Sequence, residues 1–509
     1  MPPPGAPTES EAARFLAQAG FAATPADIVH VQTQGMAGWL DEQFDAPRTL
    51  SHFDWLISKG FDKPEFRHSF AGVDASLWRK FIGSPDALRQ RVVLALSEIF
   101  VISMAGLPVA WRGFAVAAYV DMLEARAFGS FRGLLEGVTL SCGMGVYLNM
   151  RGNQKGDSRT GRLPDENYAR EVMQLFTIGL QQLGPDGRPR TDEAGPLDSY
   201  DQGDVSELAK VFTGWNFDGA SATSPEFMRR PMTHSAHRFA VGPKRVLDVA
   251  IAATADGPTA LGIALDTLAG HPNVGPFIGR QLIQRLVCSD PSPAYVRRVA
   301  EVFADNGQGE RGDIRAVLRA ILLDPEAREP APGPATGKLR EPMLRFIQWA
   351  RTVGLKSPNE LWNVGSLADP AKRLGQSPLR SPSVFNFFRP GYVPPNTELG
   401  KLGVTAPEFQ LCNETSVAGY LNFMQGVISN GIGELKPDYT TELGLANDAS
   451  ALVERYALLL AANALSAHSK AVITDAVATI AARSDAGRRN RIRAATLLVM
   501  ASPEYLIQQ

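Results

Sequence analysis

Helix-start signals recur along this chain more regularly than any other pattern. The segment TPADIVHVQTQGMAGWLDEQF opens with Thr24 as an N-cap, Pro25 at the first helical position and Asp27 at the third. Apolar residues then follow at intervals of three and four. Similar starts occur at Ser84 and Ser292, each followed by proline. Runs that alternate apolar and polar residues, as half-buried strands do, are nearly absent. The pattern therefore predicts a chain that is helical almost throughout.

Length and sequence breaks indicate how these helices are organised. At 509 residues the chain exceeds what one hydrophobic core usually serves, and Gly-rich or Pro-rich breaks separate the helices. We expect a mainly α fold, a multi-helical single body with two or three packed helical subdomains and at most a small β-hairpin between Phe217 and Asp248. The expected parts are a linker remnant at 1–11, an N-terminal helical domain at 12–330, and a C-terminal helical region at 331–509 packed on it.

Charge and hydropathy exclude two broad classes of protein. The formal net charge is only -2, and the chain lacks the basic face that nucleic-acid binding requires. No apolar run approaches the roughly 18 residues needed to span a bilayer, so we expect no transmembrane segment.

The first residues have neither the basic nor the apolar part of a signal peptide. Taken as a complete native sequence, the chain would therefore be cytoplasmic.

Seven segments, in this order, give the chain a family resemblance: EAARFLAQAGF, LRQRVVLALSEIFVIS, PDENYAREVMQLFTIGL, DVSELAKVFTGW, LAGHPNVGPFIGRQLIQRLVCSDPSPAYVRRVAEVF, RGDIRAVLRAILLDPEAR and SPSVFNFFRPGYVPP. With these segments the chain resembles the large bacterial family catalogued as domain of unknown function 1800. The resemblance implies an exported protein of the periplasm or cell surface, with MPPPGAPTES as the stump of a linker. It also implies a partner similar to the sulfatase and alkaline phosphatase superfamily, and work on polymers or surface material.

The densest polar segment is GRLPDENYAREVMQLFTIGL. Pro164 suits the first turn of a helix, and Asp165 and Glu166 suit the positive end of its dipole. These preferences account for two of the acids without any function. The segment also resembles the strongest motif of the family, and we count Arg162 and Asp165 among the residues expected to bind a ligand.

The polar residues that follow share one face of the same helix. Asn167, Arg170, Glu171 and Gln174 lie at positions i, i+3, i+4 and i+7. One interpretation is a solvated helix surface with an ion pair between Glu166 and Arg170. The other is a site in which Glu166 or Glu171 exchanges a proton. In that site Arg170 orients an anionic or polyhydroxyl ligand, and Asn167 supplies a neutral hydrogen bond.

A second polar segment, YDQGDVSELAKVFTGWNF, is expected to form the other wall of this site. Asp204 and Glu207 have the spacing of a capping box, which accounts for both acids. Asp204 is also the nearest candidate for the second acid that a catalytic carboxylate needs. Trp215 directly follows the end of the helix. Its indole is either a platform on which a sugar stacks or an anchor in the core.

The segment MTHSAHRFAVGPKRVL contains two histidines three residues apart, His234 and His237. Together with Asp204 or Glu171 they could bind one metal ion. Paired loop histidines beside arginine are more often plain polar residues of the surface, and the pattern is not that of zinc proteases. We therefore expect no tightly bound metal and no cofactor. Both histidines and Lys244 are counted as candidates for substrate binding.

Motifs of serine hydrolases, P-loop NTPases and dinucleotide-binding proteins are missing. The first hypothesis is an enzyme, a hydrolase or lyase, that acts on a polymer or glycan with its carboxylates and arginine. The alternative is a non-catalytic binding or assembly partner of the exported sulfatase-like or phosphatase-like protein. A deep cleft with converging charges favours the first, and a broad, shallow patch with aromatic anchors favours the second.

Overall fold

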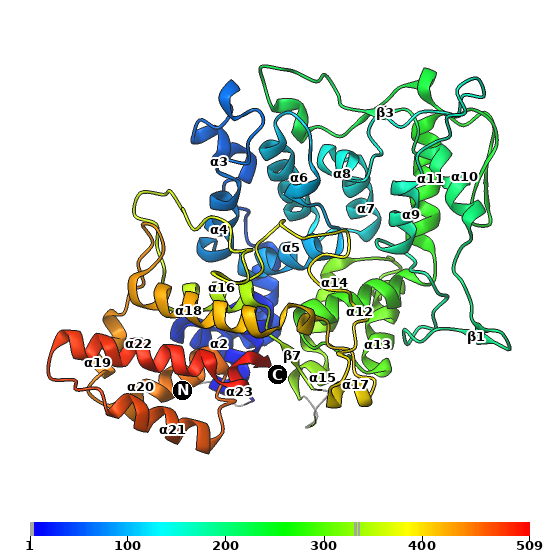
Figure 1. Ribbon diagram of the computed structural model, residues 1–509. Helices are drawn as coiled ribbons and strands as arrows, with labels where there is room; N and C mark the ends of the chain where they lie inside the picture. The colour runs from blue at the N-terminus through cyan, green and yellow to red at the C-terminus, as the bar shows by residue number, and fades with distance from the viewer. Residues whose placement is uncertain (1–4, 330–332, 334–335) are drawn as a thin grey trace.

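The computed structural model describes residues 5–329, 333 and 336–509, and helices dominate it (Figure 1). The prediction of a mainly α, multi-helical fold is confirmed. The helices of the first half are α1 (Glu9–Gly20), α2 (Pro25–Asp45), α3 (His52–Ser58), α4 (Val73–Gly83), α5 (Ala87–Ile99), α6 (Arg112–Arg126), α7 (Phe131–Leu140), α8 (Cys142–Tyr147), α9 (Asn167–Gln174) and α10 (Gln202–Val211). Those that follow are α11 (Gly257–Gly270), α12 (Val274–Leu286), α13 (Pro293–Ala304), α14 (Ile314–Leu323), α15 (Pro325–Arg328), α16 (Pro342–Thr352), α17 (Glu398–Lys401), α18 (Glu414–Asn430), α19 (Thr440–Leu445), α20 (Ala449–Ala461), α21 (Ala467–Ala478), α22 (Asp485–Ala501) and α23 (Pro503–Leu506).

The predicted helix starts depend on their capping side chains, and one of them is misplaced. Thr24 caps α2 in a reciprocal capping box with Asp27, and Ser292 accepts a hydrogen bond from a backbone N–H of α13. The start predicted with Ser84 as N-cap lies two residues later, because Asp86 is the N-cap residue and α5 begins at Ala87. Asp86 does not cap that helix with its side chain. Its carboxylate instead accepts hydrogen bonds from buried neighbours, Ser84 among them.

The β structure is minor, as predicted, but it is divided among four antiparallel pairs in the described part of the chain. Two pairs lie near the predicted hairpin, and a third joins distant parts of the sequence through residues 338–339 and 507–508. The pairs are β1 (Thr191–Asp192) with β2 (Gly195–Pro196), β3 (Trp215–Asn216) with β4 (Thr233–His234), β5 (Lys244–Val246) with β6 (Val249–Ile251), and β7 (Lys338–Leu339) with β8 (Ile507–Gln508).

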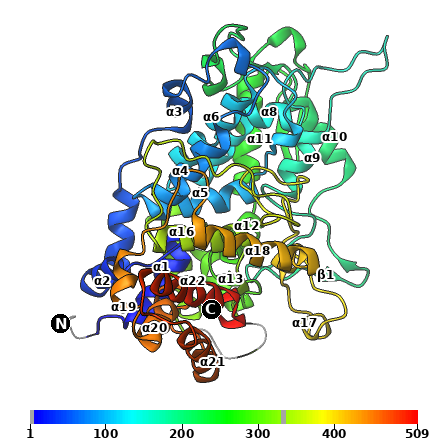
Figure 2. The ribbon, with the colours of Figure 1, turned by 60° about the vertical axis from the view of Figure 1, so that its left-hand side comes forward.

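One continuous hydrophobic core runs through the N-terminal and C-terminal parts. The Trp78 ring of α4 meets the Phe346 ring of α16 edge to face, with centroids 5.4 Å apart, and α1 packs against α20. In both ribbon views the C-terminal helices α18 to α23 lie below α4 and α16, whereas α9 and α10 lie on the opposite, upper side (Figures 1 and 2). Among the described residues, every helix is too short or too polar to cross a membrane.

The limits predicted for the linker remnant and for the two helical domains fall partly outside the described residues. The boundary between 330 and 331 lies there, and so do residues 1–4 of the predicted linker remnant. Within the described residues, α1 begins at Glu9, and Thr8 caps it in a capping box with Glu11. The subdomain division itself stays a prediction.

A polar cluster on α9 and α10 and a neighbouring cavity

Glu166 connects the two helices that were predicted to form the walls of a site. Its carboxylate accepts hydrogen bonds from Ser206 Oγ at 2.6 Å, Gln202 Nε2 at 2.8 Å and Arg170 Nη2 at 3.2 Å. Arg170 also donates to Gln202 Oε1 at 3.0 Å. The hydrogen bond from Ser206, followed by that from Gln202 and the charge of Arg170, lowers the pKa of Glu166 against the opposing effect of burial. The predicted ion pair between Glu166 and Arg170 is therefore present, within a network that spans α9 and α10.

Helix α9 begins later than the sequence pattern suggests. Its first residue is Asn167, so Pro164 and Asp165 precede the helix and do not form its first turn. Asn153 holds this entry segment, because its side chain bonds both the N–H and the carbonyl of Asp165. Asp165 in turn accepts a hydrogen bond from the backbone N–H of Asn167 at 2.8 Å. The exposed Arg162 donates from Nε to the carbonyl of Lys155 in the loop before the helix.

Glu171 differs from Glu166 in environment although both lie on the same helix segment. Its side chain is half-buried, and its Oε2 atom is buried without a hydrogen-bond partner among the described residues. Burial raises the pKa of Glu171, and the charge of Arg170 opposes this rise only in part. Tyr147 and Tyr200 lie close enough that the charge of Glu171 raises their pKa values, in addition to the effect of burial. The pKa of Glu166 is therefore lowered from the usual value for glutamate, whereas that of Glu171 is raised.

Asp204 takes part in a capping box, as the sequence predicted, but its partner is not the predicted Glu207. The capping box of α10 consists of Asp201 as N-cap and Asp204 as its third residue. It does not consist of Asp204 and Glu207, because Glu207 instead forms an ion pair with Lys210. Asp204 Oδ1 lies 3.2 Å from Arg245 Nη2. None of these contacts links Asp204 to Glu166 or Glu171, so the structure does not place it as their second acid.

Trp215 and Lys244 are packed into the protein and do not line an open site. Trp215 is 4% exposed and donates from Nε1 to the carbonyl of Val211 at 3.4 Å. Of the two interpretations of Trp215, its burial agrees with an anchor in the core and leaves no ring face on which a sugar could stack. Lys244 is also buried, with Nζ bonded to the carbonyl of Gly242 and placed 4.3 Å from the centre of the Phe239 ring.

The two histidines of the predicted substrate site lie in different environments. His234 packs against the Trp215 ring and so close to Gly257 that a Cβ on that glycine would lie 2.0 Å from Nε2. Burial lowers the pKa of His234. His237 is exposed and shares a hydrogen bond of 2.9 Å with Ser235. The described residues bring neither histidine into a group with metal-binding spacing.

Replacing Arg170 with Ala tests whether this cluster is a buried structural network. The Arg170 side chain is 40% exposed, so its loss leaves Glu166 with two remaining donors and access to water. We expect the free energy of unfolding to fall by less than about 1 kcal/mol. Chemical denaturation of the variant and the wild type measures this difference. Loss of folding in the variant would contradict the exposed arrangement of the cluster.

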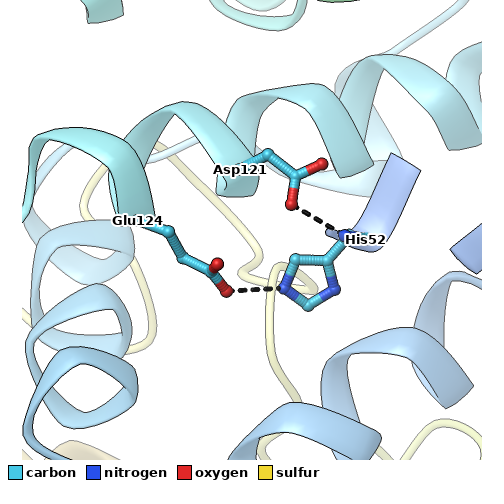
Figure 3. A group of neighbouring side chains, drawn as sticks. All are labelled: His52, Asp121 and Glu124. Carbon is cyan, nitrogen blue, oxygen red and sulfur yellow. Dashed lines mark hydrogen bonds and ion pairs between the residues drawn. The ribbon is translucent and has the colours of Figure 1, made fainter. Parts of the chain in front are cut away.

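Sequence reasoning missed a buried group formed by His52, Asp121 and Glu124 (Figure 3). The possible ligand atoms lie within 4.8 Å of one another, and His52 Nε2 is 3.2 Å from Glu124 Oε1. Glu124 Oε2 is 2.5 Å from Nζ of the buried Lys80. The other ring nitrogen of His52 shares a hydrogen bond with Ser76 at 2.6 Å.

The same group is already satisfied by protein partners. Both carboxylate oxygens of Asp121 accept hydrogen bonds from the first backbone N–H groups of α3, those of His52 and Phe53. Burial alone would raise the pKa of Glu124, but hydrogen bonds and charges from His52 and Lys80 outweigh it and hold that pKa at about 2. A cation would have to compete with the ammonium group of Lys80. We therefore interpret the group as a polar network that joins α3, α4 and α6.

A cavity of about 500 Å³ lies at the C-terminal end of α9. Gln174, the last residue of its polar face, lines this cavity, and so do Glu98 of α5 and Arg285 of α12. The cavity joins four segments that also carry the family resemblance: LRQRVVLALSEIFVIS, PDENYAREVMQLFTIGL, the part GPFIGRQLIQRL, and SPSVFNFFRPGY. An acid within an otherwise apolar run, as Glu98 is, was the available sequence signal.

Comparison with known proteins identifies the family. No curated protein and no solved structure matches the chain. A family model described as "Protein of unknown function (DUF1800)" matches residues 14–507, nearly the whole chain. This match confirms the resemblance carried by the seven sequence segments, and the chain therefore belongs to the DUF1800 family.

Proposed function

We propose that the protein is an enzyme that cleaves a polar polymer, such as a glycan, by hydrolysis or elimination at the polar face of α9. The observation that carries this proposal is the carboxyl group of Glu171. This carboxyl is half-buried, and one of its oxygens has no hydrogen-bond partner among the described residues. The positive charge of Arg170, the preceding residue, favours its ionised form and so opposes the rise in pKa that burial causes. Unpartnered polar groups in such positions are costly, and functional sites are where proteins commonly retain them.

The surroundings of the two carboxyls suggest different roles. The raised pKa of Glu171 favours a carboxyl that holds a proton closer to neutral pH, as a general acid does. Glu166, whose pKa is lowered, stays ionised and orients Arg170 through their ion pair. Arg170 remains 40% exposed and is available to bind an anionic or hydroxyl group of the polymer. Following the family resemblance, we propose that this activity lies outside the cytoplasm.

Replacing Glu171 with Gln tests the proposal. In a panel of neutral and acidic glycans, we expect the substrate that the wild type cleaves to lose about 100-fold or more of its turnover. The melting temperature should change little, because the amide is nearly isosteric. Glu207→Gln, on the neighbouring α10, is the matched control and should keep full activity. The pH profile adds a check, since wild-type activity should fall as pH rises through the raised pKa of Glu171.

Full activity of Glu171→Gln would contradict this assignment. Binding of a polymer or protein without turnover of any panel member would favour the second candidate, a non-catalytic partner of an exported sulfatase-like or phosphatase-like protein. One observation favours that candidate: Leu163 and Leu180, which lie on either side of α9 in the sequence, are 80% and 55% exposed. In that case Leu163→Ser should reduce co-purification of the partner, whereas Glu171→Gln should not.

A further inference from the structure

The cavity beside α9 has apolar walls and a polar floor, and we use the word floor for Glu98, Gln281 and Arg285. It lies between α5, α12, the segment that follows α9, and the connector at 384–391. Arg389 stands exposed at its edge. Most of its lining surface is apolar, which is typical of a pocket for a small organic ligand. The apolar side chains of the wall are Leu175, Leu183, Phe277, Val384 and Phe385.

Two buried donors at the floor have no acceptor in the part of the chain that the structure describes. Gln281 is 8% exposed, and its Nε2 has no hydrogen-bond partner among the described residues. Arg285 is 3% exposed, and its Nη1 lies 3.4 Å from Glu98 Oε2, an ion-pair distance without hydrogen-bond geometry. A buried donor without an acceptor destabilises the folded state, so both groups need an explanation. An acceptor that enters the cavity from outside would satisfy both.

Glu98 does not provide that acceptor, because neither of its buried carboxyl oxygens forms a hydrogen bond with a described residue. Burial raises the pKa of Glu98 well above its usual range, and the charge of Glu341 adds to the rise. The positive charges of Arg285 and Lys338 oppose this rise without cancelling it. A protonated Glu98 leaves Arg285 without a counter-charge on the cavity side.

Three buried cations lie beside the polar end of the cavity. The cations are Arg91, Arg285 and Lys338, and all three side chains are buried. The carboxylates are Glu341 and Glu408, each within 3.4 Å of Lys338 Nζ. Lys338 thus has two carboxylate partners, whereas Arg285 Nη1 has no hydrogen-bond acceptor among the described residues. An anion in the cavity would supply this acceptor.

We propose that this cavity binds a small monocarboxylic acid with an apolar or aromatic body, whose carboxylate accepts hydrogen bonds from Arg285 Nη1 and Gln281 Nε2. The apolar walls enclose the body of the ligand, and Arg389 lies at the mouth where an incoming anion would pass. This inference is independent of the proposed polymer cleavage, because it rests on a different set of donors. Either one can fail while the other stands.

Three probes of equal size test the charge requirement: 4-phenylbutyrate, 4-phenylbutanol and 4-phenylbutylamine. Titration calorimetry with the full chain at pH 6 should show the carboxylate binding at least about tenfold more tightly than the alcohol, and the amine binding least. Affinity for the carboxylate should fall as pH rises and Glu98 loses its proton, because its charge would then pair with Arg285. Equal affinity for acid and alcohol would overturn the proposal.

Gln281→Leu separates ligand binding from structural support. Because Gln281 Nε2 has no acceptor among the described residues, its removal should raise the melting temperature by about 1–2 °C while weakening phenylbutyrate binding at least fivefold. Gln284→Leu on the same helix is the matched contrast. Its Nε2 donates to the carbonyls of Ser289 and Pro390, so that variant should melt at a lower temperature. Unchanged affinity of Gln281→Leu for phenylbutyrate would contradict the proposal.

A blocking variant locates the binding in this cavity. Gly391 lines it, and a Cβ built there meets no atom within 4 Å. Gly391→Trp should abolish phenylbutyrate binding without unfolding the protein. Gly426→Trp, on the exposed face of α18 and equally unobstructed, should keep wild-type affinity. If Gly391→Trp binds phenylbutyrate as the wild type does, the ligand lies elsewhere and the assignment of this cavity is wrong.

Discussion

Replacing Glu124 with Ala is expected to lower the free energy of unfolding by about 3–5 kcal/mol. The variant leaves the ammonium group of Lys80 buried without a counter-charge, since the side chains of Lys80 and Glu124 are 0% and 1% exposed. It also removes one of the acceptors of Gln90, which donates to Glu124 at 3.2 Å and to Asp86. Urea denaturation measures the loss. Glu136→Ala serves as the control, because the Glu136 side chain is 47% exposed and should contribute less than about 1 kcal/mol.

A double variant distinguishes the missing counter-charge from lost packing. Lys80→Met combined with Glu124→Leu removes both charges and keeps the apolar volume, so it should recover much of the stability that Glu124→Ala loses. A double variant less stable than Glu124→Ala would contradict this explanation. The pH dependence gives a second check. The pKa of Glu124 is about 2 in the folded protein, so its stabilising contribution is complete above the unfolded value near 4.5. That contribution should disappear as pH falls from there toward 2.

Lys338→Met is expected to produce the second large loss, again about 3–5 kcal/mol. Lys338 Nζ donates to the carbonyls of Gln284 at 3.0 Å and Arg285 at 3.1 Å. It also lies 3.4 Å from Glu341 and 3.3 Å from Glu408. Methionine fills similar space but leaves two buried carboxyls without their cation. Thermal and urea unfolding measure the effect.

The control for Lys338 is Lys401→Met. The Lys401 side chain is 71% exposed, and its ion pair with Glu398 lies on the surface, so we expect a loss below about 1 kcal/mol. Similar losses for the two methionine variants would show that the buried position of Lys338 does not matter. A further expectation concerns pH, because Glu341 has a pKa of about 2 in the folded protein. The difference between wild type and Lys338→Met should shrink as pH falls below about 4.5.

The sequence predicted most of the local structure because helix capping involves residues close together along the chain. Thr24 and Asp27 are three residues apart, and their reciprocal hydrogen bonds follow directly from the pattern. Errors arose where a distant residue took over a local role. Asp165 looks like a residue of the first helical turn, yet Asn153, twelve residues earlier, holds it in the segment before the helix. The α9 start therefore moved from the predicted Pro164 to Asn167.

The polar cluster of α9 could be predicted in part, and the buried networks could not. Glu166 and Arg170 are four residues apart on one helix, so their pairing is a local property. Ser206 and Gln202 join them only because α10 packs on α9. Lys80 and Glu124 are 44 residues apart, and each resembles an ordinary charge on a helix surface until the fold buries it. Only the three-dimensional packing determines which charges lose contact with water.

The short β7–β8 pair has a consequence for the order in which this protein assembles. Beside that pair, Gln508 Nε2 donates to the carbonyl of Leu286 at 3.0 Å, and Lys338 supplies donors for two other carbonyls at the end of α12. During synthesis, α12 leaves the ribosome more than two hundred residues before Gln508 does. A nascent chain must therefore keep this helix end hydrated, or protected by a chaperone, until residue 508 emerges. Separately expressed halves of the chain should for the same reason be less soluble than the two halves made as one polypeptide.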